Sequence, residues 1–177
     1  MGKRPDSSTL DPHNQLNQLN QLGDAELLEL LLACCDVPRW AEAVRDGRPY
    51  ADAREALSVA DAAARRLSDA EVDRALAAHP RIGEQPGGSG AASEWSEQEQ
   101  SAVSSDEVTR RELLEHNRAY EERFGRVFLI CASGLSGPQI LTALRARLHN
   151  DEATEAALVA QELRKIALLR LRRVLEA

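Results

Sequence analysis

Only one segment of this 177-residue chain reads as a β-strand, and this limits the fold more than any other feature. The segment is Val127-Phe128-Leu129-Ile130-Cys131, an apolar run between Gly125 and Gly134. A single strand cannot form a sheet, because its backbone N–H and C=O groups would lack a neighbouring strand to bond with. We therefore expect an all-α fold in which residues 127–131 form one buried extended segment, with backbone partners elsewhere and a ligand among the candidates.

The composition favours helices in the rest of the chain. Apolar residues make up 43% of the sequence and aromatic residues only 3%, and Ala, Leu, Glu and Arg are abundant. The length fits one domain. We expect a single-domain bundle of about seven to nine helices at residues 23–177. Residues 1–22 repeat Asn-Gln-Leu and are strongly polar, which predicts a disordered N-terminal tail.

Capping patterns place several helix ends. Asp24 is expected to cap a helix that starts at residue 25. Ser68 and Glu71 form a capping box for a helix that ends near Ala78, and Gly125 should end a long helix that begins near residue 106. Local residues of this kind fix helix boundaries because they satisfy the terminal backbone groups directly.

Charge and targeting features restrict the partners. The net charge is −7 and the isoelectric point is near 5.2, so a coherent basic face for nucleic acid is not expected, although a small anionic substrate remains possible. Residues 1–23 have no hydrophobic signal region, and no stretch approaches the length of a membrane span. We expect a cytoplasmic protein with no membrane partner.

The cysteines and histidines do not suggest a metal centre. Cys34 and Cys35 are adjacent, and with Cys131 they form neither a disulfide framework nor a CxxC motif. Reduced thiols are therefore expected. Cys131 and three histidines, which are His79, His116 and His149, share no helical or hairpin ligand spacing, so we expect no metal.

His79 is a candidate acid or base. It extends an apolar stripe at helical spacing, which consists of Val72, Ala75 and Leu76. Pro80 ends the helix and turns the backbone of His79 into an extended conformation. The helix macrodipole stabilises an imidazolium at this position, which predicts a general acid near neutral pH. The alternative is a partly buried structural histidine whose ring nitrogens are hydrogen-bonded.

Glu99 is a second polar residue at an inward position, one helical turn from both Trp95 and Val103. Together with Ser96 and Gln100 it brings a carboxylate, a hydroxyl and an amide near a helix N-terminus, which suits a polar ligand. The alternative is simpler, because Ser96-x-x-Glu99 is also a capping-box pattern that needs no function.

Arg170 is the third inward polar residue. It occupies an apolar stripe of the last helix, which also contains Leu163, Ile166, Ala167 and Val174. Arg173 is expected to reach solvent. An inward arginine needs a partner, which is either an internal carboxylate such as Glu99 or a carboxylated ligand, and both alternatives stay open.

In order and spacing, these residues resemble the 2-oxo-4-hydroxy-4-carboxy-5-ureidoimidazoline (OHCU) decarboxylase family from about Leu22 onward. The fragments that carry the resemblance are Leu31-Leu32-Ala33-Cys34-Cys35 with Trp40, Arg48-Pro49-Tyr50, His79-Pro80-Arg81-Ile82-Gly83-Glu84, Trp95-Ser96 with Glu99-Gln100, Phe124-Gly125 with Phe128-Leu129-Ile130-Cys131, and Lys165-Ile166 with Leu169-Arg170-Leu171. The resemblance implies an all-helical, cofactor-free lyase of urate degradation that forms allantoin and is commonly a homodimer.

The resemblance also implies the site residues. The catalytic residues would be His79, as the acid or base, with Glu99 and Arg170. The residues that bind substrate would be Pro80, Ser96, Glu99, Gln100, Leu129, Ile130, Cys131, Ala132 and Ser133. The sequence departs from the family at Ser133, where many members have a basic residue. With no cofactor, the ring of the substrate must accept the electron pair left by carbon dioxide, and the protein supplies orientation, charge and a proton.

Two other functions fit the same residues. The first is a non-catalytic helical interaction module, in which Gly87–Gly90 is a linker and the polar patches are caps and salt bridges. The second is a hydrolase that acts on a related purine-derived ring, because the same acid, base and amide groups can activate water. Release of carbon dioxide separates the decarboxylase from the hydrolase.

Overall fold

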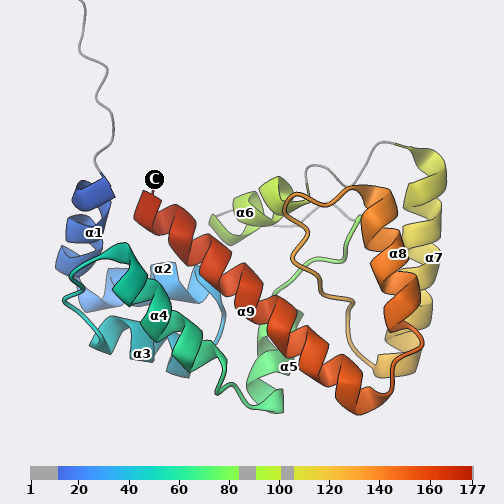
Figure 1. The fold of residues 1–177 in the computed structure, drawn as a ribbon, viewed down its shortest axis with the longest axis horizontal. Coiled ribbons are helices and arrows are strands. Elements are labelled where there is room, and N and C mark those ends of the chain that lie inside the picture. The colour runs from blue at the N-terminus through green and yellow to red at the C-terminus, as the bar shows by residue number, and fades with distance from the viewer. Residues whose placement is uncertain (1–11, 84–90, 101–105, 177) are drawn as a thin grey trace, which may run out of the picture.

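The structure is a computed structural model that describes residues 12–83, 91–100 and 106–176. Within these residues it contains nine α-helices and no β-strand, so the all-α prediction is confirmed (Figure 1). The helices are α1 (Pro12–Gln21), α2 (Asp24–Cys34), α3 (Pro38–Asp46), α4 (Ala53–Ala64), α5 (Asp69–Ala77), α6 (Ala91–Glu99), α7 (Glu107–Phe124), α8 (Gly137–Arg147) and α9 (Glu152–Glu176). The Gly87–Gly90 stretch lies outside the described residues.

Helix α9 organises the molecule. It crosses the middle of Figure 1, with α1 to α5 packed on one side and the α7–α8 pair near its other end. Two hydrophobic cores follow from this arrangement. The larger core joins α1 to α5 with α9, and the smaller one lies between α7 and α8. Each helix of these two cores therefore buries an apolar face against a neighbour, as amphipathic helices must, whereas the buried residues of α6 are Ser96 and Glu99.

The segment at residues 127–132 runs between the two cores and has neither helical nor strand structure. Leu129 belongs to the larger core, whereas Phe128 and Ala132 belong to the smaller one. Side chains supply partners for its backbone, since Arg147 donates to the Leu129 carbonyl oxygen and the Cys131 N–H donates to Glu162. The prediction of an extended segment with partners outside a sheet is therefore confirmed for these two groups.

The predicted disordered tail is wrong for residues 12–21, which form α1, while residues 1–11 lie outside the described part of the chain. The Asn-Gln-Leu repeat places leucines three residues apart on one helix face, and Leu16 and Leu19 are buried in the larger core. Asn20 also exchanges two hydrogen bonds with the backbone of Tyr50, at 3.0 and 2.9 Å. The packed part of the chain thus includes α1 as well as the domain expected at residues 23–177.

Local capping chemistry explains some of the helix ends. Ser68 and Glu71 form the predicted capping box of α5, and Gly125 ends α7 with a left-handed φ of 65°. Asp24 is not a cap, because Gly23 precedes α2 and the Asp24 carboxylate instead accepts a hydrogen bond from Arg48 at 2.6 Å. This long-range ion pair is a tertiary contact that a capping rule cannot anticipate.

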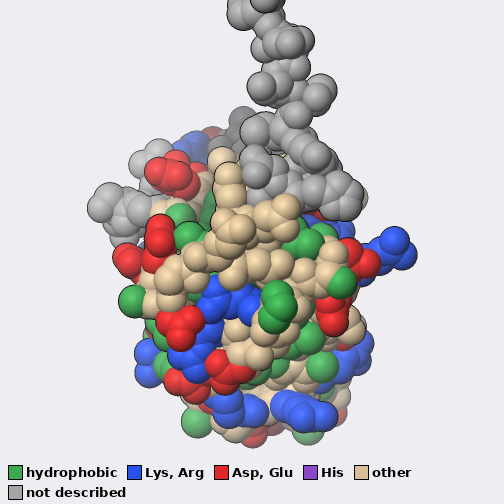
Figure 2. Space-filling view, turned by 90° about the vertical axis from the view of Figure 1, so that its left-hand side faces the viewer, with side chains coloured by type: hydrophobic (Ala, Val, Ile, Leu, Met, Phe, Trp, Pro, Cys, Tyr) green, Lys and Arg blue, Asp and Glu red, His purple; other side chains and the backbone are tan. Residues whose placement is uncertain are grey.

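The surface charges and the helix lengths can be compared with the predictions about nucleic-acid and membrane partners. On the face drawn in Figure 2, blue Lys and Arg side chains are interspersed with red Asp and Glu side chains. This mixture fits the net charge of −7 and does not resemble the basic face that phosphate backbones require. In the described ranges, no helix combines the length and apolarity needed to cross a membrane.

Candidate functional site

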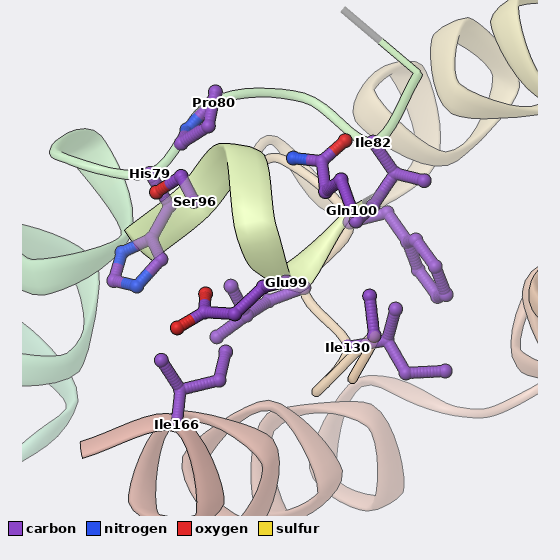
Figure 3. A pocket seen from close by; sticks show the side chains of 11 residues that line it. His79, Pro80, Ile82, Ser96, Glu99, Gln100, Ile130 and Ile166 are labelled. Carbon is purple, nitrogen blue, oxygen red and sulfur yellow. The ribbon is translucent and has the colours of Figure 1, made fainter. Parts of the chain in front are cut away.

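A small pocket with a cavity volume of about 20 Å³, partly open to solvent, lies where the C-terminal end of α5, helix α6, the 128–132 segment and α9 meet (Figure 3). It is lined by His79, Pro80, Ile82, Ser96, Glu99, Gln100, Phe128, Leu129, Ile130, Ala132 and Ile166. Apolar side chains form most of the wall, and a few polar groups converge on it. This composition is typical of small-molecule sites.

The pocket unites most of the residues expected to bind substrate. Cys131 and Ser133 are not in its wall, because the Cys131 N–H donates to Glu162 at 2.8 Å and Ser133 is exposed. Arg170 also lies behind the wall rather than in it. The sequence analysis did not identify three apolar wall residues, which are Ile82, Phe128 and Ile166, because apolar residues give no signal that distinguishes a pocket from a core.

His79 presents one unpartnered nitrogen. Its Nδ1 lies 2.8 Å from the carbonyl oxygen of Ala75, which can only accept, so Nδ1 carries the proton and donates. The Nε2 atom is buried and has no hydrogen-bond partner among the described residues. A neutral imidazole in this tautomer exposes a basic lone pair at Nε2. Because His79 belongs to the pocket wall, this lone pair makes it a candidate base of the pocket.

The environment lowers the pKa of His79 below its ordinary value of 6.5. Burial is the main cause and the Arg170 charge adds to it, while the hydrogen bond to Ala75 and the Glu99 charge act in the opposite direction. This direction disfavours the imidazolium that the sequence predicted, because burial and the Arg170 charge outweigh the hydrogen bond to Ala75 and the Glu99 charge. At pH 7 the side chain is neutral and accepts a proton.

Glu99 is paired with Arg170 inside the protein. Arg170 Nε donates to Glu99 Oε1 at 2.9 Å, and Nη2 donates to Oε2 at 3.0 Å, a bidentate arrangement. Both residues are buried, with exposed fractions of 7% for Glu99 and 3% for Arg170. Of the two alternatives left open by the sequence, the structure thus provides the internal carboxylate. In Figure 3 the carboxylate also points toward the His79 side of the pocket.

The remaining donors of Arg170 are also used within the protein. Its Nη2 donates to Ser96 Oγ at 3.0 Å and its Nη1 to the carbonyl oxygen of Ala33 at 3.3 Å. Arg173 adds a second guanidinium, 3.3 Å from Glu99 Oε1, and so does not simply point into solvent. Two cations therefore fix one carboxylate from the side away from the pocket.

Ser96 does not cap α6, which begins at Ala91. Its hydroxyl donates to the Ala92 carbonyl oxygen at 2.8 Å and accepts from Arg170. The capping-box interpretation of Ser96 and Glu99 is therefore wrong, since a residue in the middle of a helix cannot satisfy its first N–H groups. Ser96 instead connects α6 to α9 directly beneath the pocket.

Gln100 is oriented by the turn that follows His79. The Gly83 N–H donates to Gln100 Oε1 at 3.0 Å, which identifies the oxygen of the amide. Its Nε2 end then points away from Ile82, toward the side where Pro80 lies (Figure 3). Asn117 holds the same turn by donating to the Ile82 carbonyl oxygen at 2.9 Å. Gln100 can therefore donate to an oxygen of a bound ligand.

Two buried acids near the site were missed by the sequence analysis. Glu155 and Glu162 lie on the same stripe of α9 as Arg170, with exposed fractions of 1% and 9%. The rule that singled out Arg170, a charged residue at an apolar helical position, would have found both. Glu162 anchors the Cys131 N–H, and Glu155 pairs with Arg147 through Arg147 Nε at 2.8 Å.

Other polar clusters show no arrangement suited to a metal. In the part of the chain that the structure describes, no three His, Cys, Asp or Glu side chains are placed to hold an ion. His116 uses both ring nitrogens, with Nδ1 2.7 Å from the Glu112 carbonyl oxygen and Nε2 accepting from Arg145 at 3.3 Å. Burial raises the pKa values of Cys34 and Cys35 to about 12, so both are neutral thiols.

Comparison with known families gives one match that covers most of the chain. The model of the OHCU decarboxylase family matches residues 20–172. These bounds include helices α2 to α8 and all of the lining residues of the pocket.

Individual proteins agree with this match. The chain is 27% identical over 164 residues to a uric acid degradation bifunctional protein of Bacillus sp. (strain TB-90), covering 90% of this chain but only 32% of that protein. It is 28% identical over 165 residues to the 2-oxo-4-hydroxy-4-carboxy-5-ureidoimidazoline decarboxylase of Amia calva, covering 91% of this chain and 94% of that one. The chain thus spans about a third of the bifunctional relative and nearly all of the second.

A solved structure shares the fold. The crystal structure of an OHCU decarboxylase in the presence of (S)-allantoin matches with a TM-score of 0.73 and 27% identity, over 88% of this chain and 100% of that chain. The helical arrangement around the pocket is therefore similar to that of a known protein.

Proposed function

This chain belongs to the OHCU decarboxylase family, and on that premise we propose that it converts 2-oxo-4-hydroxy-4-carboxy-5-ureidoimidazoline into S-allantoin and carbon dioxide, a step of urate degradation. The observation that carries the proposal is the buried, unpartnered Nε2 lone pair of His79 in a pocket with a fixed carboxylate and amide. As part of the proposal, the enzyme acts without a cofactor, as a homodimer in the cytoplasm.

The reaction needs one base that can return its proton to carbon. When carbon dioxide leaves, the electron pair of its bond to C4 forms a C4=C5 double bond, the π pair of the ring C=N bond at the ureido-bearing carbon C5 moves onto nitrogen, and this nitrogen takes a proton from solvent. The C4 hydroxyl gives its proton to His79 Nε2 and becomes a carbonyl. His79 then delivers that proton to one face of C5, which sets the handedness of allantoin.

The other polar groups orient the substrate in this proposal. Glu99 accepts hydrogen bonds from ring or ureido N–H groups, and Gln100 donates from Nε2 to a substrate oxygen. Arg170 acts through Glu99 rather than on the substrate, because all of its nitrogens already donate within the protein. It is a positioning residue. Backbone groups of Leu129, Ile130 and Ala132 complete the wall.

The pH dependence of the reaction tests the protonation state of His79. Because its pKa lies below that of an ordinary histidine, kcat/KM should rise with pH through the folded pKa and level off above it, as the neutral form becomes the major one. The folding stability that is linked to this pKa should change with pH in the same direction as kcat/KM. The unfolded histidine binds protons more readily than the folded one, so stability is full above pH 6.5 and decreases as pH falls through the folded pKa. Initial rates and urea denaturation across pH 5–8 measure both, and activity that falls as pH rises through 6.5 would contradict a base.

The proposed activity is tested by the handedness and rate of product formation. The substrate is generated in situ from urate with two upstream enzymes, and allantoin is followed by circular dichroism. Rapid formation of one enantiomer supports the proposal, whereas slow racemic product equal to a protein-free control contradicts it. Measuring the carbon dioxide released distinguishes a decarboxylase from a hydrolase, because only the decarboxylase forms it. An interaction module would also show no stabilisation by S-allantoin in thermal unfolding.

A further inference from the structure

A buried ionic cluster lies behind the pocket wall and takes no part in the proposed chemistry. It consists of Tyr120 from α7, Arg147 from α8, Asn150 from the turn before α9 and Glu155 from the first turn of α9. The exposed fractions of Arg147 and Glu155 are only 8% and 1%. Charges buried to this degree are costly unless they are paired, so the cluster must compensate for their desolvation.

Arg147 connects this cluster to the pocket. Its Nη1 donates to the Leu129 carbonyl oxygen at 2.7 Å, and its guanidinium carbon lies 4.6 Å from the centre of the Phe128 ring. Both Phe128 and Leu129 line the pocket. One side chain therefore holds two consecutive wall residues, one through its backbone and the other through its ring.

The wall segment depends on such contacts because it belongs to no sheet. Strands are normally held by a ladder of backbone hydrogen bonds, and residues 127–132 have none in the described part of the chain. Ile130, which lines the pocket, lies between two residues held by side chains, Leu129 by Arg147 and Cys131 by Glu162. The position of the wall is thus set by charged side chains from α8 and α9.

Glu155 fixes the direction in which Arg147 points. Its carboxylate accepts from Arg147 Nε at 2.8 Å, from Asn150 Nδ2 at 2.9 Å and from the Tyr120 hydroxyl. Burial raises the pKa of Glu155, but the hydrogen bonds from Arg147, Tyr120 and Asn150 together lower it below its ordinary value. The carboxylate is therefore ionised and accepts along the Nε–Nη2 edge of the guanidinium group, which leaves Nη1 directed at Leu129.

We propose that Arg147, held by Glu155, is a positioning residue of the enzyme, which places the Phe128–Ile130 wall at the distance from His79 that the bound substrate requires. The proposal rests on the function proposed above. The alternative is a purely structural role, in which the cluster only joins α7, α8 and α9. A structural role changes the folded fraction of the protein, whereas a positioning role changes how the folded protein binds substrate.

The first test is Arg147→Lys, in which one ammonium group cannot donate to both Glu155 and Leu129 in the same planar geometry. We expect KM to rise and kcat/KM to fall by about 10- to 100-fold in the folded variant, with a lower enantiomeric excess of allantoin. The Cys131 amide should exchange with deuterium at least about tenfold faster, since its segment loses a support. Arg145→Lys is the matched control, because Arg145 is an exposed residue on the same helix that pairs with Glu112.

Tyr120→Phe is the second test and decides the question if Arg147→Lys does not fold. It removes one donor to Glu155 but retains the ring that packs on Phe124 and Phe128. We expect a smaller rise in KM, about threefold, and faster deuterium exchange of the Cys131 amide. The proposal is overturned if folded variants keep the KM and the exchange rate of the wild type, or if kcat falls only in proportion to the folded fraction. A wild-type protein without activity would overturn the proposed function itself, and this role with it.

Discussion

His79→Asn is expected to lower kcat by at least about 10²-fold while the protein folds normally, since general acid–base catalysis is worth about 10²–10⁴-fold. The asparagine amide retains a donor near the position of Nδ1, which can still reach the Ala75 carbonyl oxygen. It removes the basic, buried Nε2 atom that has no hydrogen-bond partner among the described residues. His79→Gln places an amide closer to the position of Nε2, and we expect a similar loss because an amide cannot accept a proton at neutral pH.

Rates are measured by circular dichroism of the allantoin formed, with the spontaneous reaction subtracted, and folding is checked by thermal unfolding. His116→Asn is the matched control, because His116 also bonds through Nδ1 to the carbonyl oxygen four residues earlier on its helix. Its Nε2 accepts from Arg145 and lies outside the pocket wall. Undiminished turnover by a folded His79→Asn protein would remove His79 from the mechanism.

Arg170→Met should have the largest effect on stability, lowering the free energy of unfolding by about 3–5 kcal/mol, because it leaves a buried carboxylate without its main partner. That carboxylate is Glu99, which receives two hydrogen bonds from Arg170 and one weaker contact from Arg173. Activity should also be lost, since Glu99 would no longer be held toward the pocket. Adding Glu99→Gln to the Arg170→Met protein should restore much of the stability but not the activity. The added change removes the unpaired charge together with the carboxylate that accepts hydrogen bonds from the substrate.

Urea denaturation measures these differences, and Arg172→Met is the control. Arg172 is exposed on the same helix, so its replacement should change the free energy of unfolding by less than about 0.5 kcal/mol. Equal stabilities for Arg170→Met and Arg172→Met would show that the buried pair does not contribute as described. Recovery of activity in the double variant would exclude Glu99 as the group that orients the substrate.

Two of the expectations that relied on local chemistry agree with the structure, although Asp24 does not cap α2. The Ser68–Glu71 capping box and the Gly125 helix end are short-range features, in which residues a few positions apart satisfy the same backbone groups. The polar composition of residues 12–21 gave a wrong prediction, because this segment folds as α1, where Leu16 and Leu19 are buried and Asn20 bonds to the Tyr50 backbone. A few regularly spaced leucines outweigh many polar residues when another helix is available to cover them.

The sequence by itself determined the all-α fold, and it identified His79, Glu99 and Arg170 as polar residues at apolar helical positions. This was possible because helical periodicity and capping depend on near neighbours in the chain. The pairing of Arg170 with Glu99, 71 residues away, was decided only by the packing of α6 against α9. So was the neutral state of His79, because its pKa depends on burial and on the Arg170 charge, both of which exist only once distant segments come together.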